Sequence, residues 1–107
     1  MEDEKDILRR MSSGDSDAFR LVFLKYAPRV EAFAMKMLKN IHEAQDVSQN
    51  IFTKLWMQRR ELAQVQSLNA YLFRMTRNAV LDICKHSRIR MQFENSARVD
   101  GQILCDD

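Results

Sequence analysis

The sequence is poor in the residues that form tight turns. Its 107 residues include two glycines and one proline. Strand-rich folds need many tight turns, and glycine and proline are among the residues that most often form them. Their scarcity argues strongly against an all-β fold and favours a helical one. A chain of this length normally forms one domain with a single modest core.

Cysteines and long apolar runs are also scarce. Cys84 and Cys105 are the two cysteines, and neither they nor His42 and His86 follow a metal-binding spacing. We therefore expect no metal and no cofactor, and two free thiols. No apolar run approaches the roughly 20 residues of a membrane span, and the acidic N-terminus lacks the apolar stretch of a secretory signal. These absences predict a cytoplasmic protein without membrane insertion.

Charge is unevenly distributed, although the net charge is only +2. Residues 1–18 carry six acids against three bases, and residues 92–107 carry four acids against one base. Residues 68–91, by contrast, carry five bases against one acid. A basic centre between acidic ends fits a polyanionic partner, but lysine and arginine also serve simply to solvate helix surfaces. Charge alone leaves both interpretations open.

Four segments have the apolar periodicity of helices, over residues 3–12, 16–39, 42–60 and 68–89. Gly14 suits the end of the first segment, Asp15 or Ser16 can cap the second, and Ser67 can cap the fourth. Pro28 lies inside the second segment and predicts a kink there, or two abutting helices. The apolar stripe of that segment alternates steps of four and three, over Phe19, Phe23, Tyr26, Val30, Phe33 and Met37.

The third and fourth segments each have one apolar side that should face the core. In the third it comprises Ala44, Ser48, Ile51, Phe52 and Leu55, and in the fourth Leu68, Leu72, Met75, Ala79 and Ile83. A polar connector over 61–66 joins them. The periodicity fails after residue 90, which predicts a domain over 1–90 followed by a flexible tail or the start of an interdomain linker over 91–107. The predicted fold is all-α, a compact bundle of three to four helices.

A second side of the 42–60 helix lies opposite its apolar side. It carries neutral amides, one carboxylate and a methionine, with a tryptophan beside them: Asp46, Gln49, Asn50, Thr53, Met57 and Trp56. A merely solvated face usually carries lysine and glutamate, whereas amides, methionine and tryptophan suit a protein-binding surface. The alternative interpretation is that Trp56 belongs to the core and the amides are incidental.

The 68–89 helix also has a second side, made of Tyr71, Arg74, Asn78, Leu81, Lys85 and Arg88, with Arg77 at its border. Aromatic rings stack on unpaired bases, cations hold phosphates, and asparagine can read an adenine edge. The alternative is a solvated basic face with Tyr71 half in the core. The sequence has no glycine-rich phosphate loop, zinc pair or nucleophile motif, so we do not expect an enzyme.

Three motifs resemble those of bacterial sigma factors of the extracytoplasmic-function (ECF) group. Asp17-Ala18-Phe19, with Tyr26 following, resembles the start of the second conserved region. The run over residues 43–56, EAQDVSQNIFTKLW, resembles the most specific signature of this group. The run over residues 70–78, AYLFRMTRN, with Asp82 four residues on, resembles the next conserved helix. Together they cover about residues 5–90.

The resemblance implies the helical sigma region-two fold and a role in transcription initiation. The 42–60 helix would dock on the coiled coil of the beta-prime subunit of core RNA polymerase, through Asp46, Gln49, Asn50, Thr53 and Trp56. Residues 61–67 and the following helix would recognise and melt the promoter minus-ten element, with DNA-binding residues Tyr71, Arg74, Arg77, Asn78, Lys85 and Arg88. An anti-sigma factor is a further partner that the resemblance implies.

The sequence departs from the family pattern at Gln45 and Asn50, where acids are usual, and fewer charges there could weaken or alter the polymerase contact. Complete members of the family carry a C-terminal helix-turn-helix domain that reads the minus-thirty-five element. This chain ends at Asp107, within what would be the linker, so we expect it to lack that recognition. Two alternatives stay open: a repressor module that inserts a helix into duplex DNA, and a helical protein-interaction module that binds no nucleic acid.

Overall fold

A computed structural model of the chain describes residues 3–94, with side chains described up to residue 86. Within that range the chain forms α1 (Glu4–Ser12), α2 (Ser16–Leu38), α3 (Ile41–Met57), the short 3-10 helix η1 (Arg59–Gln64) and α4 (Leu68–Glu94), with no strand. The prediction of an all-α fold is confirmed.

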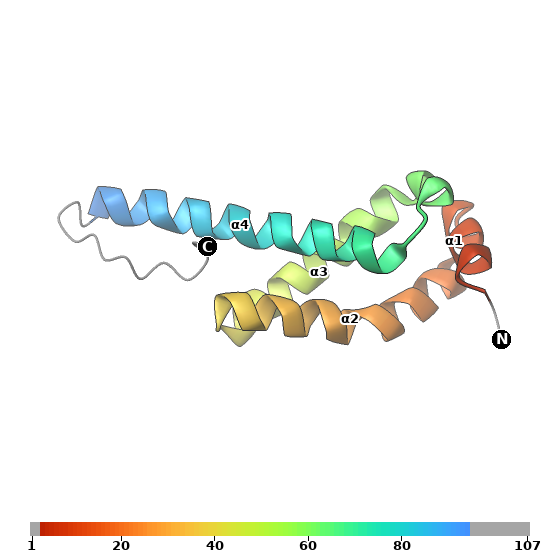
Figure 1. Ribbon diagram of the computed structural model, residues 1–107, viewed down its shortest axis with the longest axis horizontal. Helices are drawn as coiled ribbons and strands as arrows, with labels where there is room; N and C mark the ends of the chain where they lie inside the picture. Colours follow the sequence, from red (N-terminus) through yellow and green to blue (C-terminus); the bar gives the residue numbers. More distant parts are fainter. Residues whose placement is uncertain (1–2, 95–107) are drawn as a thin grey trace.

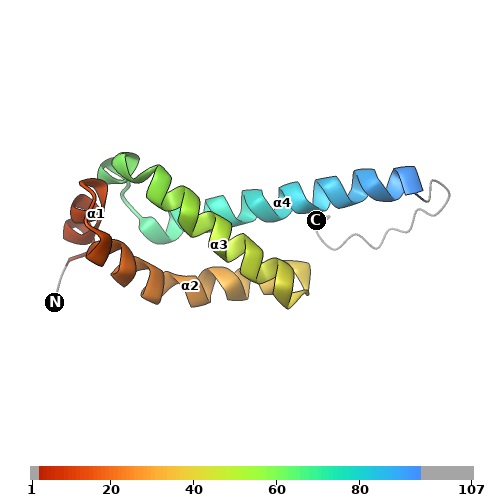
Figure 2. The ribbon, with the colours of Figure 1, turned by 180° about the vertical axis from the view of Figure 1, so that it is seen from behind.

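The three long helices form the body of the molecule. Helices α2 and α4 run in roughly the same direction, and α3 returns between them at a slant (Figure 1). Helix α1 packs against η1 at one end, where α2 begins and α3 ends. The second half of α4 extends beyond the other helices, as the reverse view shows (Figure 2). This arrangement leaves one side of α3 and much of α4 facing outward.

Side chains at the helix starts satisfy backbone N–H groups that have no partner within the helix. The Asp15 carboxylate accepts from the backbone N–H groups of Asp17 and Ala18 at 2.9 and 3.3 Å. The Ser67 hydroxyl accepts from the N–H of Ala70 at 3.2 Å. Gly14 has a φ of +101°, a value that residues with a Cβ rarely adopt. The predicted caps at Asp15 and Ser67 and the predicted turn at Gly14 are confirmed.

Pro28 does not divide α2 into two helices. The helix is continuous from Ser16 to Leu38, and it bends near its middle (Figure 1). Pro28 is exposed, so the backbone carbonyl that loses its hydrogen bond to the missing N–H lies on the solvent side, where water can replace that bond. Of the two predicted alternatives, the kink is the one that the structure adopts.

The core rows of α2 and α4 differ from the predicted stripes. In α2 every fourth residue is buried, namely Ala18, Val22, Tyr26, Val30, Ala34 and Leu38. In α4 the buried row is Leu68, Leu72, Thr76, Val80 and Cys84, while the predicted Met75, Ala79 and Ile83 are half-buried beside it. A step of four residues turns 400° around the helix, so such a row drifts sideways, as a helix that crosses its neighbours requires.

Size explains which residues of α2 are buried. Small side chains such as Ala18 and Ala34 let helix backbones approach closely, while Phe19 and Phe33 lie half-buried on the flanks. Of the six predicted stripe residues of α2, only Tyr26 and Val30 are fully in the core. The buried hydroxyl of Thr76 donates to the backbone oxygen of Leu72 at 2.7 Å, so its polar atom is satisfied.

Three further expectations need correction. The connector is not simply polar, because η1 places Leu62 in the core with no exposed surface. Helix α4 continues to Glu94, past the predicted end at residue 89. Cys84 is disulfide-bonded, so the expectation of two free thiols is wrong. Disulfides depend on which sulfurs meet in space, and spacing along the sequence does not reveal that.

Tyr26 links α1 to the centre of α2 and gives the fold a pH dependence. Its hydroxyl donates to a carboxylate oxygen of Glu4 at 3.3 Å. Burial raises the pKa of Tyr26 above its ordinary value of 10.0, and the charge and hydrogen bond of Glu4 raise it further, while Arg29 opposes them. Because the folded state holds this proton more tightly, the stabilisation is complete below about pH 10 and is lost as pH rises through the folded pKa.

We expect Tyr26→Phe to lower the free energy of unfolding by about 1 kcal/mol at neutral pH, because one hydrogen bond is lost. Above pH 10, the variant should lose less stability than the wild type with each further rise in pH. Urea unfolding between pH 7 and 11 measures both. Tyr71, whose pKa is also raised, keeps its own contribution in both proteins. Parallel pH profiles for the two proteins would show that Tyr26 does not carry the effect.

Candidate functional site

Helix α3 separates a buried side from an exposed one. Ala44, Val47, Ile51 and Leu55 are buried against the other helices. The opposite side exposes the residues that the sequence predicted to face a protein partner, namely Asp46, Gln49, Asn50 and Thr53. We call these four residues the α3 face. The Thr53 hydroxyl donates to the backbone oxygen of Gln49 at 2.9 Å, which leaves the amide and carboxylate groups as the polar contacts that this face can offer.

Trp56 lies between the two interpretations of its role. It is half-buried, and its ring meets Phe19 edge-on with centroids 5.1 Å apart. The Arg59 guanidinium lies 4.3 Å from the centre of the Trp56 ring and donates to the Trp56 backbone oxygen at 2.9 Å. Trp56 is therefore packed from both α2 and η1, and it remains a predicted contact residue at the edge of the α3 face.

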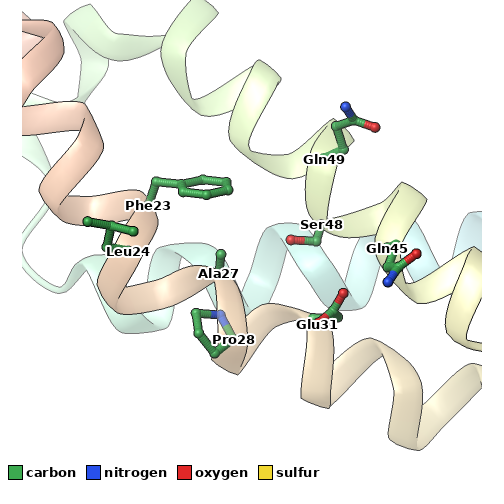
Figure 3. A pocket seen from close by; sticks show the side chains of 8 residues that line it. All are labelled: Phe23, Leu24, Ala27, Pro28, Glu31, Gln45, Ser48 and Gln49. Atoms are coloured by element: carbon green, nitrogen blue, oxygen red, sulfur yellow. The ribbon is translucent and has the colours of Figure 1, made fainter.

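Two hollows run along the α3 face, between α2 and α3. One, of about 490 Å³, places Phe23, Ala27 and Glu31 of α2 opposite Ser48 and other polar residues of α3 (Figure 3). The second, of about 360 Å³, lies beside it toward Trp56 and Met57 and shares Phe23 and Gln49 with the first. The amide of Gln49 thus stands beside an apolar groove.

Sequence reasoning missed this groove because it placed Phe23 in the core. Phe23 is 40% exposed, although its ring packs edge-on against Phe52 with centroids 5.1 Å apart. The signal that points to it is the parallel row of small residues at every fourth position of α2. That row competes with the aromatic stripe for the core, and helices approach closely only where side chains are small.

The outward side of α4 carries the predicted nucleic-acid residues. Arg74, Arg77, Asn78 and Lys85 are exposed, and Tyr71 is half-buried. With Tyr71 they form what we call the α4 face. The side chain of Arg88, also predicted to bind DNA, lies outside the described side chains.

Tyr71 stands where the end of α3 meets α4. Its hydroxyl lies 3.4 Å from the side-chain oxygen of Gln58, the residue that follows α3. Burial raises the pKa of Tyr71, the negative charge of Glu61 raises it further, and Arg74 opposes them. The phenol therefore stays protonated at neutral pH, so its ring offers a neutral aromatic surface beside exposed guanidinium groups.

The described residues contain no group of three or more potential metal ligands. Among the helices of residues 3–94, none combines the length and the apolar character that crossing a membrane requires. The arrangement therefore consists of two outward surfaces, one amide-rich beside an apolar groove and one aromatic and basic.

Comparison with known proteins identifies the class as the sigma factors of transcription initiation. Residues 22–89 match the family described as Sigma-70 region 2. The ECF RNA polymerase sigma factor SigW of Bacillus subtilis is 26% identical over 78 residues, which cover 73% of this chain and 42% of SigW. The sigma factor CarQ of Myxococcus xanthus is 30% identical over 81 residues, which cover 76% of this chain and 47% of CarQ.

The RNA polymerase sigma-H factor of Pseudomonas aeruginosa is 27% identical over 77 residues, which cover 72% of this chain and 40% of that factor. No solved structure matches the chain significantly. The chain belongs to the sigma-70 region 2 family, and it spans less than half the length of the curated relatives it matches. The resemblance to ECF sigma factors is thereby confirmed.

Proposed function

We propose that this chain is the part of an ECF sigma factor that binds core RNA polymerase through the α3 face and holds the melted minus-ten element through the α4 face. The observation that carries the proposal is the division of sides on α3 and α4. Each helix buries one side in the core and exposes the other, and the exposed sides carry the residues that the family motifs predict.

The α3 face suits a protein partner, and we propose the beta-prime coiled coil. Asp46 supplies one carboxylate, Gln49 and Asn50 supply amides, and the adjoining groove supplies apolar surface. Apolar contact with a few directional polar groups is the usual composition of a protein–protein interface. Trp56 and Thr53 complete the predicted contact set.

The α4 face suits unpaired DNA. Extruding a base costs a few kcal/mol, and stacking on an aromatic side chain returns about 1–3 kcal/mol per base. Tyr71 offers the ring, Asn78 an amide for a base edge, and Arg74, Arg77 and Lys85 charges for phosphates; Arg88 is a further predicted contact. Such a surface shifts the melting equilibrium toward the open strand without covalent chemistry, so we propose a binding protein and not an enzyme.

Since the gain from stacking only roughly offsets the cost of melting, we propose that docking on polymerase supplies the remaining affinity. The free chain then binds DNA weakly. We further propose a cytoplasmic location, regulation by an anti-sigma factor, and a domain over residues 1–90 followed by a tail or linker over 91–107.

The test of the polymerase contact is the double variant Asp46→Ala/Gln49→Ala. Exposed polar contacts contribute up to about 1 kcal/mol each, so losing both should weaken binding to core RNA polymerase by about tenfold. Affinity is measured by anisotropy with the labelled chain. The matched control, Asp17→Ala/Gln64→Ala, removes the same two side-chain types from exposed positions outside the α3 face and should bind like the wild type.

Equal loss in the two double variants would contradict the proposed face. Binding of duplex DNA in preference to single strands, with no binding to polymerase, would support the repressor alternative instead.

A further inference from the structure

A third hollow lies between α2 and α4, separate from the groove beside α3. Its volume is about 400 Å³, and its lining includes Tyr26, Arg29 and Phe33 of α2 and Asn69 and Phe73 of α4. At 100° per residue, Phe73 stands about 160° around α4 from Tyr71. The proposed function uses none of the groups in this hollow.

One side of the hollow is an aromatic platform. The ring centroids of Phe33 and Phe73 are 4.5 Å apart, with the rings tilted by 52°. This contact holds Phe73 from below, yet 47% of Phe73 remains exposed. A ring that is fixed by a neighbour and still accessible can accept a stacked base with little loss of side-chain freedom.

A cation and an amide stand at the rim. The Arg29 guanidinium lies 5.4 Å from the centre of the Tyr26 ring, and its Nη1 donates to the side-chain oxygen of Asn69 at 3.5 Å. Lys25, whose Nζ lies 5.2 Å from the same ring, adds a second positive charge nearby. Arg29 is exposed, so these two contacts orient its charge without burying it.

The charge of this hollow distinguishes it from the neighbouring one. Its lining contains Arg29 and no acid, whereas the larger hollow beside α3 contains Glu31 and no cation. Around α4, the exposed surface between Tyr71 and Phe73 carries Arg74 and Arg77. Positive charge therefore continues from the α4 face to the hollow, and the chemistry there is complementary to an aromatic ring that carries a phosphate.

We propose that the hollow between α2 and α4 is a second nucleotide-binding site, which takes an unpaired DNA base on Phe73 while Arg29 holds an adjacent phosphate. The Asn69 amide group faces the same space and can donate to a base edge. The proposal rests on the proposed function, because it extends the path of the single strand from the α4 face around α4 toward α2.

The test measures binding of a fluorescein-labelled oligothymidine of about 12 nucleotides, within the range of known single-strand site sizes, at low salt by anisotropy. We expect Phe73→Leu, which keeps apolar contact with Phe33 but removes the stacking ring, to weaken binding by fivefold or more. The matched control is Phe23→Leu, which makes the same change at a similarly exposed ring in the other groove and should have no effect.

The phosphate contact has its own readout. Arg29→Gln should reduce the slope of log K against log salt by about 0.7, the value for one phosphate contact with a single strand. Arg20→Gln, an exposed change on the opposite side of α2, should leave the slope unchanged. Arg29 is exposed, so its replacement tests the site without disturbing the core.

Unchanged binding by Phe73→Leu and Arg29→Gln, together with weaker binding by Tyr71→Leu, would overturn the second site and leave the proposed function intact. If Phe73→Leu weakened polymerase binding but not DNA binding, the occupant would be a protein and the site as proposed would be wrong. No binding of the oligonucleotide by the wild-type chain, alone or with polymerase, would overturn both proposals.

Discussion

Replacing Leu55 with alanine should lower the free energy of unfolding by about 2–5 kcal/mol, the usual cost of removing a fully buried leucine side chain. Leu55 has no exposed surface and lies on the buried side of α3, where the helix packs on the rest of the bundle. A small domain has only about 5–15 kcal/mol of total stability, so this change alone can bring the chain close to unfolding. Urea denaturation followed by circular dichroism measures it.

Met57→Ala, two residues further along α3, is the matched control. Met57 is 73% exposed, and surface substitutions usually change stability by less than about 0.5 kcal/mol. The pair of variants therefore tests which side of α3 belongs to the core. Comparable losses in both variants would mean that α3 has no free outward side, and the α3 face would then be unavailable to a partner.

The second large effect is expected at Tyr71. Tyr71→Ala should weaken binding of single-stranded DNA to the polymerase-bound chain by about 5- to 150-fold, because the stacking of one base contributes about 1–3 kcal/mol. Tyr71→Phe keeps the ring and removes only the hydroxyl that lies beside Gln58, so it should bind nearly as well as the wild type. Fluorescence anisotropy with labelled DNA gives both affinities.

A thermal unfolding curve for each variant separates binding from folding, since Tyr71 is half-buried. If the phenylalanine and alanine variants lost affinity equally, the hydroxyl and not the ring would carry the contact. That result would contradict the stacking role proposed for the α4 face.

Local features of the fold could be predicted from the sequence because they depend on neighbouring residues. The caps at Asp15 and Ser67 follow from the ability of short polar side chains to accept backbone N–H bonds. The exposed side of α3 also follows locally, because a helix places residues three and four apart on one side. Asp46, Gln49, Asn50 and Thr53 are exposed as predicted.

Features that depend on how helices cross could not be predicted in this way. The buried rows of α2 and α4 step by four residues because the helices pack at an angle, and no single segment reveals that angle. For the same reason Phe23, expected in the core, lines a groove. Leu62 looked like part of a polar connector, and only its packing under α1 and α3 makes it a core residue.

The candidate site shows the same division. Helical spacing predicted the exposed positions Arg74, Arg77, Asn78 and Lys85. The hollow between α2 and α4 joins residues such as Arg29 and Asn69 that are 40 positions apart, and sequence periodicity carries no information about that pairing. Their roles in binding remain predictions that the variants above test.

The most direct test of the central claim is a titration of labelled single-stranded DNA with this chain, alone and in the presence of core RNA polymerase. The account predicts weak binding by the free chain and clearly tighter binding once polymerase is present, with the Asp46→Ala/Gln49→Ala variant losing much of the difference. Equal affinity with and without polymerase would contradict the claim that one outward side of the bundle binds the enzyme while the other holds the open strand.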